Sequence, residues 1–322
     1  MIQVIDLLND AVRRGETLFG FELLPPLKGD GKSGIFKAID NVIEYNPAYI
    51  NITFHREGLK ATQRPDGGYD YHVVRKRPGT VGIAASIQNK YDIPAVPHII
   101  CGGMSKYDIE DALIDMDFLG INNVLALRGD PRHYEKQFIP VPNGHSHAVD
   151  LIRQIRAMNR GEFIDGEADV CHHSKFCIGV AGYPEKHSTA ESLESDIEYL
   201  KMKVDSGAEY VVTQMFFDNE KYFRYVELCR EKGIDVPIIP GLKPLVNGRQ
   251  IESLPETFSI NIPEELRKAV EDCKGDKEKI RHVGLEWSIH QSKDLMAHGV
   301  PALHFYTMSR TESIAYIARH VF

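Results

Sequence analysis

The sequence predicts an α/β protein: a (β/α)8 barrel in which residues 1–322 form one domain with an N-terminal helix. Three observations predict this fold. Short β-rich runs recur along the chain, segments with helical periodicity separate them, and no change in composition marks a linker. The β-rich runs are eight in number and cover residues 18–25, 48–54, 95–101, 123–129, 175–184, 209–217, 236–244 and 302–310.

The elements follow one another in the order that a barrel requires. An amphipathic helix opens the chain at residues 1–16, and later helices are visible as "DIEDALIDMDFLG", "AESLESDIEYLKMKVDSG" and "EKYFRYVELCREKG". Glycine ends four helices shortly before the next strand, at Gly120, Gly207, Gly233 and Gly299. The strands are apolar throughout, which indicates burial on both faces. A doubly wound sheet is the alternative, but eight unbroken βα units favour closure.

Composition excludes several classes of partner. The chain has a formal net charge of −8, and its largest basic cluster is the short run 75–77, so we expect neither nucleic-acid nor membrane binding. No signal peptide or membrane-spanning run stands out. The five cysteines are scattered, which is typical of reduced thiols in a cytoplasmic protein. We expect small-molecule substrates and a homo-oligomer.

Nearly every predicted strand finishes on a polar or ionisable side chain. In a (β/α)8 barrel, catalytic groups lie at the carboxyl ends of the strands, so these residues are the candidate site. They are Glu22, Thr53, His98, Arg128 with Asp130, Tyr183, Gln214, Lys243 and Arg310.

Glu22 is the most informative of these residues. It lies in "GFELLPP", between Phe21 and Leu23. An apolar setting disfavours the charged carboxylate, so we expect a raised pKa and a proton held near neutral pH. Such a group is suited to general acid catalysis, and pairing with a structural cation is the alternative interpretation.

Nine motifs in order resemble the methylenetetrahydrofolate reductase family: "FELLPP", "NITF", "PHIIC", "LALRGD", "AGYPEKH", "LKMKVDSGA", "TQMFFD", "IIPGLKP" and "HFYTMSR". They extend from about residue 17 to 310 and resemble the family's catalytic barrel alone. The resemblance implies a flavoprotein with FAD, which takes a hydride from NADH or NADPH. It further implies ping-pong reduction of 5,10-methylenetetrahydrofolate to 5-methyltetrahydrofolate, supplying methyl groups for methionine synthesis. Short bacterial members usually favour NADH.

The resemblance also implies roles for individual residues. Glu22 matches the general acid that protonates the folate N10, and Asp130 matches an aspartate near the flavin and the pterin. Folate-binding positions match Asp130, Gln214, Gln250 and Arg310. Cofactor-binding positions match Thr53, Phe54, His55, His98, Arg128, Gly129, Asp130, Ala148, Tyr183, His187, Ala190, Asp196, Tyr199 and Lys203.

Some positions depart from the family pattern. Phe54, His55 and Arg56 replace an aromatic, a glycine and an alanine, and Tyr199 replaces an asparagine near the flavin. Leu254 aligns with an aromatic that stacks on bound ligand, and Lys243 replaces an apolar residue. The insertion-like stretch 57–92 leaves open whether it closes over the site.

Two other functions stay open on the sequence. One is a Schiff-base or metal-dependent lyase built around Lys243 or the histidines. The other is a non-catalytic subunit that binds folate or flavin. We expect no metal, because the spacing in "CHHSKFC", residues 171–177, matches no standard zinc pattern.

Overall fold

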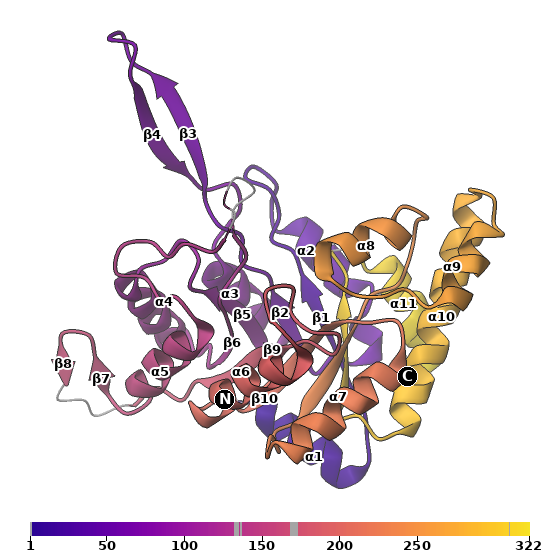
Figure 1. Cartoon of the computed structure of the whole chain (residues 1–322). Helices are drawn as coiled ribbons and strands as arrows, with labels where there is room; N and C mark the ends of the chain where they lie inside the picture. The colour runs from indigo at the N-terminus through magenta and orange to yellow at the C-terminus, as the bar shows by residue number, and fades with distance from the viewer. Residues whose placement is uncertain (1, 132–134, 136, 168–172, 309) are drawn as a thin grey trace.

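The computed structural model describes residues 2–131, 135, 137–167, 173–308 and 310–322, and its centre is a closed barrel of eight parallel strands (Figure 1). Around the barrel the strands run in the order β1-β12-β11-β10-β9-β6-β5-β2, and β2 pairs with β1 to close it. The predicted fold class is therefore confirmed. The strands are β1 (Leu18–Leu23), β2 (Tyr49–Ile52), β5 (Ala95–Ile100), β6 (Asn123–Leu127), β9 (Cys177–Gly182), β10 (Tyr210–Met215), β11 (Ile238–Leu242) and β12 (Ala302–Tyr306).

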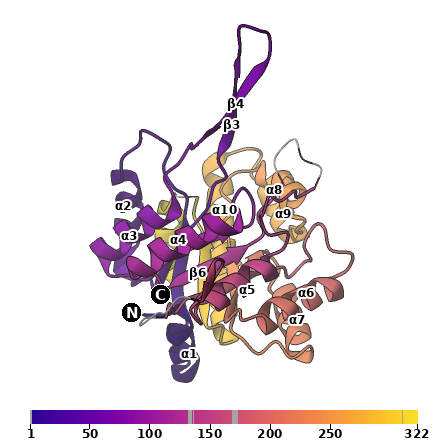
Figure 2. The ribbon, with the colours of Figure 1, turned by 90° about the vertical axis from the view of Figure 1, so that its left-hand side faces the viewer.

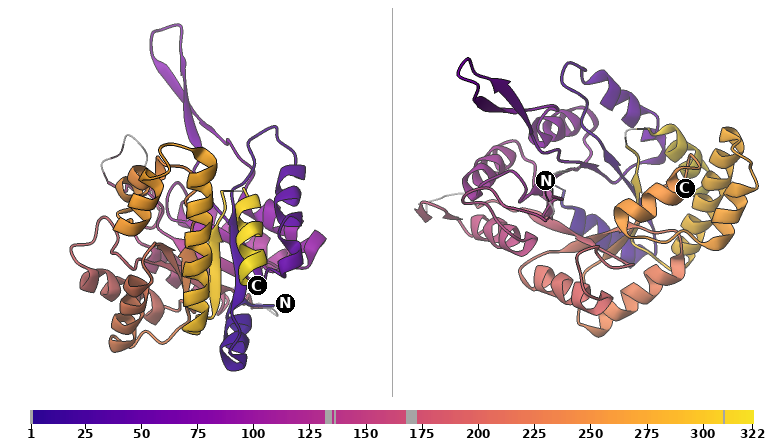
Figure 3. Two further views of the ribbon diagram at one scale, coloured as in Figure 1. Left: turned by 90° about the vertical axis from the view of Figure 1, so that its right-hand side faces the viewer. Right: turned by 45° about the horizontal axis from the view of Figure 1, so that its top comes forward.

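Helices surround the strands as an outer layer (Figure 3). Each of the four glycines expected to end a helix has a positive φ, between 70° and 118°, which glycine adopts without strain. The helices and one 3-10 turn are α1 (Val4–Arg14), α2 (Ser33–Asp40), η1 (Ile43–Tyr45), α3 (Thr80–Tyr91), α4 (Lys106–Phe118), α5 (Ala148–Met158), α6 (Leu193–Asp205), α7 (Asn219–Glu231), α8 (Gln250–Phe258), α9 (Glu264–Glu271), α10 (Lys277–Ala297) and α11 (Glu312–Val321).

The side chains of each barrel strand point alternately outward, toward the helices, and inward, toward the barrel axis. Residues such as Phe21 and Leu23 point outward and join the main core, which includes Ile39 of α2 and Ile317 of α11. Alternate residues fill the inside of the barrel. The carboxyl ends of the strands therefore form one rim, and the inward residue nearest that rim on β1 is Glu22.

Close packing fills the middle of the barrel. The ring of Tyr49 occupies the space beside Gly20, where an added Cβ would lie 2.4 Å from the ring. Tyr210 fills the space beside Gly179 in the same way, also at 2.4 Å. Large aromatic residues thus face glycines across neighbouring strands, so the barrel interior is a packed core.

Helix α1 closes the end of the barrel opposite the rim (Figure 1). Val4 and Leu8 pack with inward-facing residues of the strands, including Val96 and Leu125. The backbone N–H of Val4 donates to Oδ1 of Asn123 at 2.8 Å, and Nδ2 of Asn123 donates to the carbonyl of Ile2 at 3.0 Å. The N-terminal helix predicted from the sequence is therefore part of the barrel.

The stretch 57–92 has two parts. Strands β3 (Gly58–Gln63) and β4 (Tyr69–Val74) form an antiparallel hairpin that projects away from the barrel (Figures 1 and 2). Helix α3 then returns to the outer layer and packs against β5. A second, small hairpin pairs β7 (Glu162–Phe163) with β8 (Gly166–Glu167). The first hairpin stands clear of the barrel and does not cover the rim.

No helix in the described ranges is both long enough and apolar enough to cross a membrane.

Candidate functional site

The carboxyl group of Glu22 lies at the rim among residues from neighbouring strands. In the β1–β12 register Glu22 is opposite Tyr306, and in the β1–β2 register it is opposite Asn51. Its side chain is 13% exposed, and Oε2 lies 3.5 Å from Nε2 of the buried His98. Thr53, just beyond β2, also contacts the carboxyl group. These residues form the acid side of the rim.

Burial raises the pKa of Glu22 to about 7. A hydrogen bond from Thr53 and the charge of Lys243 act in the opposite direction and are weaker. The expectation of a raised pKa is thus confirmed, and its main cause is desolvation, as predicted. Near neutral pH the carboxyl group is divided between its protonated and ionised forms.

The neighbour of Glu22 is an uncharged histidine. Burial lowers the pKa of His98 to about 3, so the imidazole is neutral at physiological pH. The amide Nδ2 of Asn51 lies 3.3 Å from Nε2 of His98 and donates to it, which makes Nε2 the nitrogen that carries a lone pair. The neutral imidazole therefore places no positive charge beside Glu22 that would favour the carboxylate.

Lys243 belongs to the same part of the rim. It follows Leu242, whose register partner Phe305 precedes Tyr306, so Lys243 is level with Tyr306 and Glu22. Burial lowers the pKa of Lys243, and the nearby carboxyl group of Glu22 partly offsets this shift. The lysine that departs from the family pattern therefore faces the predicted acid.

The opposite part of the rim carries charge. Arg128 follows β6, Tyr183 follows β9, and His187 lies in the loop before α6. The rings of Tyr183 and His187 meet edge to face at a centroid distance of 4.7 Å. Burial lowers the pKa of His187, and the charge of Arg128 lowers it further. We call Arg128, Tyr183, His187, Asp196 and Lys203 the cationic side of the rim.

Helix α6 supplies two groups of opposite charge to the cationic side, the half-buried Lys203 and the buried Asp196. Nζ of Lys203 donates to the carbonyl of Ala181 at 2.6 Å, and Oδ2 of Asp196 accepts from the backbone N–H of His187 at 2.8 Å. Burial lowers the pKa of Lys203 to about 8, Asp196 raises it, and Arg128 lowers it. Two cations are therefore held close together against one buried carboxylate.

Asp130 lies at the exposed end of this side. Its carbonyl accepts from Nη1 of Arg56 at 3.1 Å, and Arg56 also approaches Glu135 at 3.6 Å. The guanidinium of Arg56 packs against Gly102, where an added Cβ would be 3.2 Å from it. Arg56 thus joins the loop after β2 to the loop after β6, which explains one departure noted in the sequence.

The structure places the other predicted residues as follows. Gly129 has φ +84°, and a Cβ there would meet Ile100 at 3.2 Å. Gln214 is the second-last residue of β10, and its Oε1 accepts from the backbone N–H of Met215 at 2.9 Å. Oε1 of Gln250 accepts from two N–H groups of the preceding loop, at 2.7 and 3.0 Å, so this amide also holds the loop together. The carbonyl of Ala190 accepts from Nζ of Lys186 at 2.7 Å, and burial and the charge of Arg77 lower the pKa of His55. The remaining positions lie just after β2 (Phe54), at the start of α5 (Ala148), on α6 (Tyr199) and after β12 (Arg310).

Leu254, on α8, is buried in an apolar cluster. Its partners there include Met215, the last residue of β10, and Leu245, in the loop after β11. Its side chain packs inside the protein. Tyr199, in contrast, is exposed on α6.

Some residues of the rim were missed by sequence reasoning. Asn51 orients His98, and Tyr306 donates its hydroxyl to the carbonyl of Thr213 at 2.7 Å while facing Glu22. His304 stacks on Tyr49 beneath them, with ring centroids 5.8 Å apart. All three point into the barrel at alternate strand positions. The sequence signal that could have identified them is strand alternation: every second residue counted back from the end of a strand points into the barrel.

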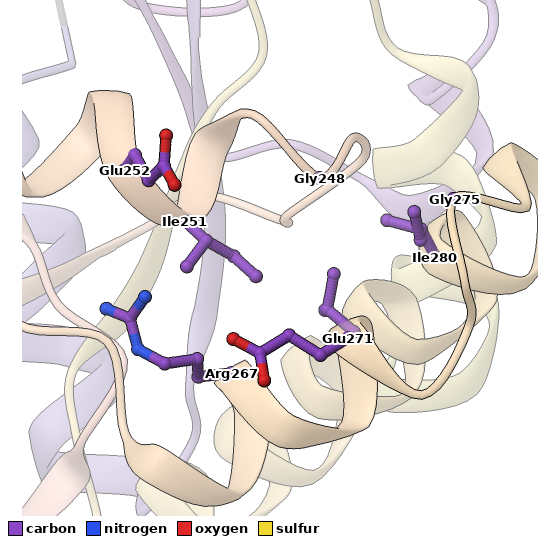
Figure 4. A pocket seen from close by; sticks show the side chains of 8 residues that line it. Gly248, Ile251, Glu252, Arg267, Glu271, Gly275 and Ile280 are labelled. Carbon is purple, nitrogen blue, oxygen red and sulfur yellow. The ribbon is translucent and has the colours of Figure 1, made fainter.

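Two cavities lie outside the rim. One, of about 220 Å³, lies between α8 and α9 and is lined by Ile251, Glu252, Arg267 and Glu271 among others (Figure 4). The other, of about 420 Å³, lies beside Trp287. Neither is lined by a residue of the acid side or the cationic side, so neither is the candidate site.

Metal ligands do not gather in the described part of the chain: no group of three His, Cys, Asp or Glu residues there could hold an ion. Cys171 and His172 of the motif considered for zinc lie outside the described residues. The other four cysteines are not in disulfides.

Comparisons with known proteins agree on one family. The family model described as "Methylenetetrahydrofolate reductase" matches residues 7–321. "Methylenetetrahydrofolate reductase (NADH) 1" of Arabidopsis thaliana is 33% identical over 97% of this chain and 49% of the relative. "5,10-methylenetetrahydrofolate reductase" of Pectobacterium carotovorum is 28% identical over 93% of this chain and 88% of the relative. The chain thus spans about half the length of the plant relatives it matches.

Solved structures with a similar fold have low sequence identity. A Clostridium thermocellum protein, described as binding two copies of 5-methyl-5,6,7,8-tetrahydrofolic acid, has a TM-score of 0.53 at 14% identity, covering 98% of each chain. A 2,3-dimethylmalate lyase has a TM-score of 0.50 at 10% identity, covering 99% of this chain and 85% of the lyase. At these identities the likeness supports the barrel fold alone.

Proposed function

Because the chain belongs to the methylenetetrahydrofolate reductase family, we propose that it reduces 5,10-methylenetetrahydrofolate to 5-methyltetrahydrofolate. The reductant would be NADH or NADPH, and the cofactor would be FAD. Relatives are named for each nicotinamide: the Arabidopsis protein for NADH and a Caenorhabditis elegans protein for NADPH. Both dinucleotides therefore belong in the test.

One observation carries this proposal: the buried carboxyl group of Glu22, with a pKa of about 7, at the rim of the barrel. Reduction of the folate requires its five-membered ring to open, and protonation of N10 makes that nitrogen a leaving group. Glu22 would give its proton to N10, leaving an electrophilic iminium at N5. Such a positioned acid contributes about 10²–10⁴-fold to rate.

The surroundings of Glu22 suit this role. His98, 3.5 Å from the carboxyl group, is neutral and adds no positive charge, and Asn51 holds its ring by donating to Nε2. Lys243 favours the ionised form, so it would help the carboxyl group release its proton. The acid is thereby held near the midpoint of its titration, where donation is efficient at neutral pH.

The cationic side fits an anionic cofactor. Arg128 and Lys203 are close enough for the charge of Arg128 to lower the pKa of Lys203, and an anion such as a diphosphate would relieve that repulsion. Bound FAD would supply hydride transfer between the nicotinamide and the folate. In this proposal Arg128, His187, Asp196 and Lys203 bind the cofactor, and Tyr183 packs against it.

Substrate contacts complete the proposal. Gln214 has an amide that can donate and accept at the edge of a pterin ring. Asp130 would stabilise the cationic iminium by its negative charge. Gln250 and Arg310 are further folate contacts in the proposal, and Thr53 is a nicotinamide contact.

The test follows the two halves of the reaction separately. Purified protein loaded with FAD is mixed anaerobically with NADH or NADPH, and loss of flavin absorbance is recorded. Methylenetetrahydrofolate is then added, and we expect absorbance to return with formation of methyltetrahydrofolate. Bleaching without return would support a flavin-binding subunit, and no bleaching with either dinucleotide would refute the reductase proposal.

Lys243 favours a second candidate, a Schiff-base lyase. Its amine is half-buried, and burial lowers its pKa, both of which suit attack on a carbonyl. Borohydride trapping separates the candidates. A lyase would incorporate a carbonyl substrate covalently at Lys243, whereas a reductase would not.

A further inference from the structure

Arg56 lies in the short segment between the end of β2 at Ile52 and the start of β3 at Gly58. Its side chain is only 14% exposed, and its guanidinium reaches the loop that follows β6. Nη1 donates to the backbone carbonyl of Asp130 at 3.1 Å and lies 3.6 Å from Oε2 of Glu135. One largely buried cation therefore meets two acceptors from the same loop.

Two glycines after β5 make room for this guanidinium. An added Cβ at Gly102 would lie 3.2 Å from Cδ and Nε of Arg56 and 3.3 Å from Cζ, and one at Gly103 would lie 3.4 Å from Nε. Atoms added to a packed contact force their neighbours to move, so a side chain at position 102 would displace the guanidinium. Arg56 thus packs on backbone that glycine leaves free.

The loop after β6 is held at two places by different groups. The backbone N–H of Gly102 donates to the carbonyl of Arg128 at 3.1 Å, which extends the pairing of β5 with β6 beyond both strand ends. The chain then turns at Gly129, whose φ is +84°. Glycine adopts this φ without strain, and it also leaves the backbone more freedom than other residues do. Strand pairing thus fixes Arg128, whereas Arg56 holds Asp130 beyond the turn.

The hydrogen bonding of Arg56 favours a role beyond stability. Nε of Arg56 is buried and has no hydrogen-bond partner in the part of the chain that the structure describes. A buried donor without a partner lowers stability, which offsets part of what the contacts with Asp130 and Glu135 contribute. Side chains that break such a rule are concentrated at functional sites. This one is bonded to the loop that carries the proposed aspartate.

Asp130 needs such a support if it is to act as proposed. It is exposed, and it directly follows a glycine. A carboxylate stabilises a developing charge efficiently only where its position is fixed beforehand, and a displacement of about 1 Å can slow a reaction by ~10²-fold. The flexible turn before Asp130 does not supply that fixed position, so it has to come from another part of the chain.

We propose that Arg56 is the positioning residue of Asp130: it holds the loop beyond Gly129 so that the carboxylate keeps one position at the rim. This inference rests on the proposed function. Direct contact between Arg56 and an anionic ligand is the competing interpretation. The contacts of the guanidinium with Asp130, Glu135 and the backbone of Gly102 leave little of it exposed, which favours positioning.

Proteolysis of the folded protein tests the contact without any ligand. An endoproteinase that cleaves before aspartate can cut between Gly129 and Asp130, and mass spectrometry of that cut reports how often the loop opens. We expect several-fold faster cleavage in Arg56→Ala and in Gly102→Ala. Combining them should add nothing, because both changes remove the same contact. Arg64→Ala, in the turn between β3 and β4, is the matched control and should behave as the wild type does.

Far-UV circular dichroism checks that each variant is folded. An unchanged cleavage rate in Arg56→Ala would overturn the proposal. So would additive effects of Arg56→Ala and Gly102→Ala, because the glycine would then act through something other than the guanidinium.

The two half-reactions then test the function of the contact. Arg56→Ala should slow reoxidation of the flavin by methylenetetrahydrofolate by roughly 10–100-fold, while flavin reduction by the dinucleotide and FAD affinity stay close to the wild type. Arg56→Lys keeps the charge and a donor, so it should recover part of the rate.

Three other results lead to different conclusions. Weaker FAD binding with an unchanged folate half-reaction would show direct ligand contact, and an equal loss in both half-reactions would show a structural role. Either result overturns the positioning of Asp130 by Arg56. A wild type that does not reduce the folate would instead refute the proposed function, and proteolysis would still decide whether Arg56 holds the loop.

Discussion

The acid side and the cationic side of the rim differ in which ionisable groups they contain and in how those groups are buried. On the acid side a carboxyl group, an uncharged histidine and a lysine share a buried setting, and burial holds the pKa of Glu22 at about 7. On the cationic side Arg128 and Lys203 lie near two carboxylates, Asp196 and Asp130. The comparison teaches that burial and charge vary from strand to strand in one barrel, and in the proposed function this variation separates proton donation from anion binding.

Glu22→Gln should have the largest effect and should break only the acid side. Gln cannot donate a proton to N10, so we expect the folate half-reaction to slow by about 10²–10⁴-fold while flavin binding and reduction by NADH persist. Stopped-flow absorbance of each half-reaction measures this. Glu227→Gln, on an exposed carboxylate of α7, is the control, and an equal loss in both half-reactions would make Glu22 structural.

The same substitution should stabilise the protein at high pH. The pKa of Glu22 is raised from an ordinary value of 4.5 to about 7, so the folded state resists ionisation. The wild type then loses stability as pH rises from 4.5 through 7, by an amount on the order of 3 kcal/mol. Glu22→Gln lacks this loss. Urea unfolding at pH 4.5 and pH 8 measures the difference, and a pH-independent difference would contradict the raised pKa.

Lys203→Met should affect the cationic side alone. Losing a charge-assisted contact should weaken FAD binding by roughly 10–100-fold. Fluorescence titration of the apoprotein with FAD measures this. Lys201→Met changes a partly exposed lysine of the same helix, which pairs with Asp205, and should leave FAD affinity unchanged. Equal weakening in both variants would contradict a specific role for Lys203.

Lys243→Met should have the smallest effect, a shift in a pH profile. Its charge lowers the pKa of Glu22, so its removal should raise that pKa. The protonated acid then persists to higher pH, and the alkaline limb of the folate half-reaction moves upward. Lys243→Arg keeps the charge and should restore the wild-type profile. An unmoved limb in Lys243→Met would separate Lys243 from Glu22.

The sequence predicted those features that depend on local pattern. Each barrel strand was recognisable from its apolar run, and Glu22 from its place near a strand end. Tyr306 and Asn51 were missed because their importance depends on register between strands distant in the sequence. The hairpin was missed as an element because its strands are exposed and carry polar residues. Its signal was the alternation in "YDYHVV", where Tyr69, Tyr71 and Val73 occupy every second position.

The position of α1 affects how ligands reach and leave the candidate site. Val4 and Leu8 close the far end of the barrel, so in the part of the chain that the structure describes ligands reach Glu22 from the rim. In the proposed reaction the oxidised nicotinamide leaves before the folate enters, so an excess of either substrate would block the site for the other. High concentrations of the nicotinamide dinucleotide should therefore inhibit competitively against the folate, and high folate against the dinucleotide. Slow dissociation of the oxidised dinucleotide would then limit the turnover rate.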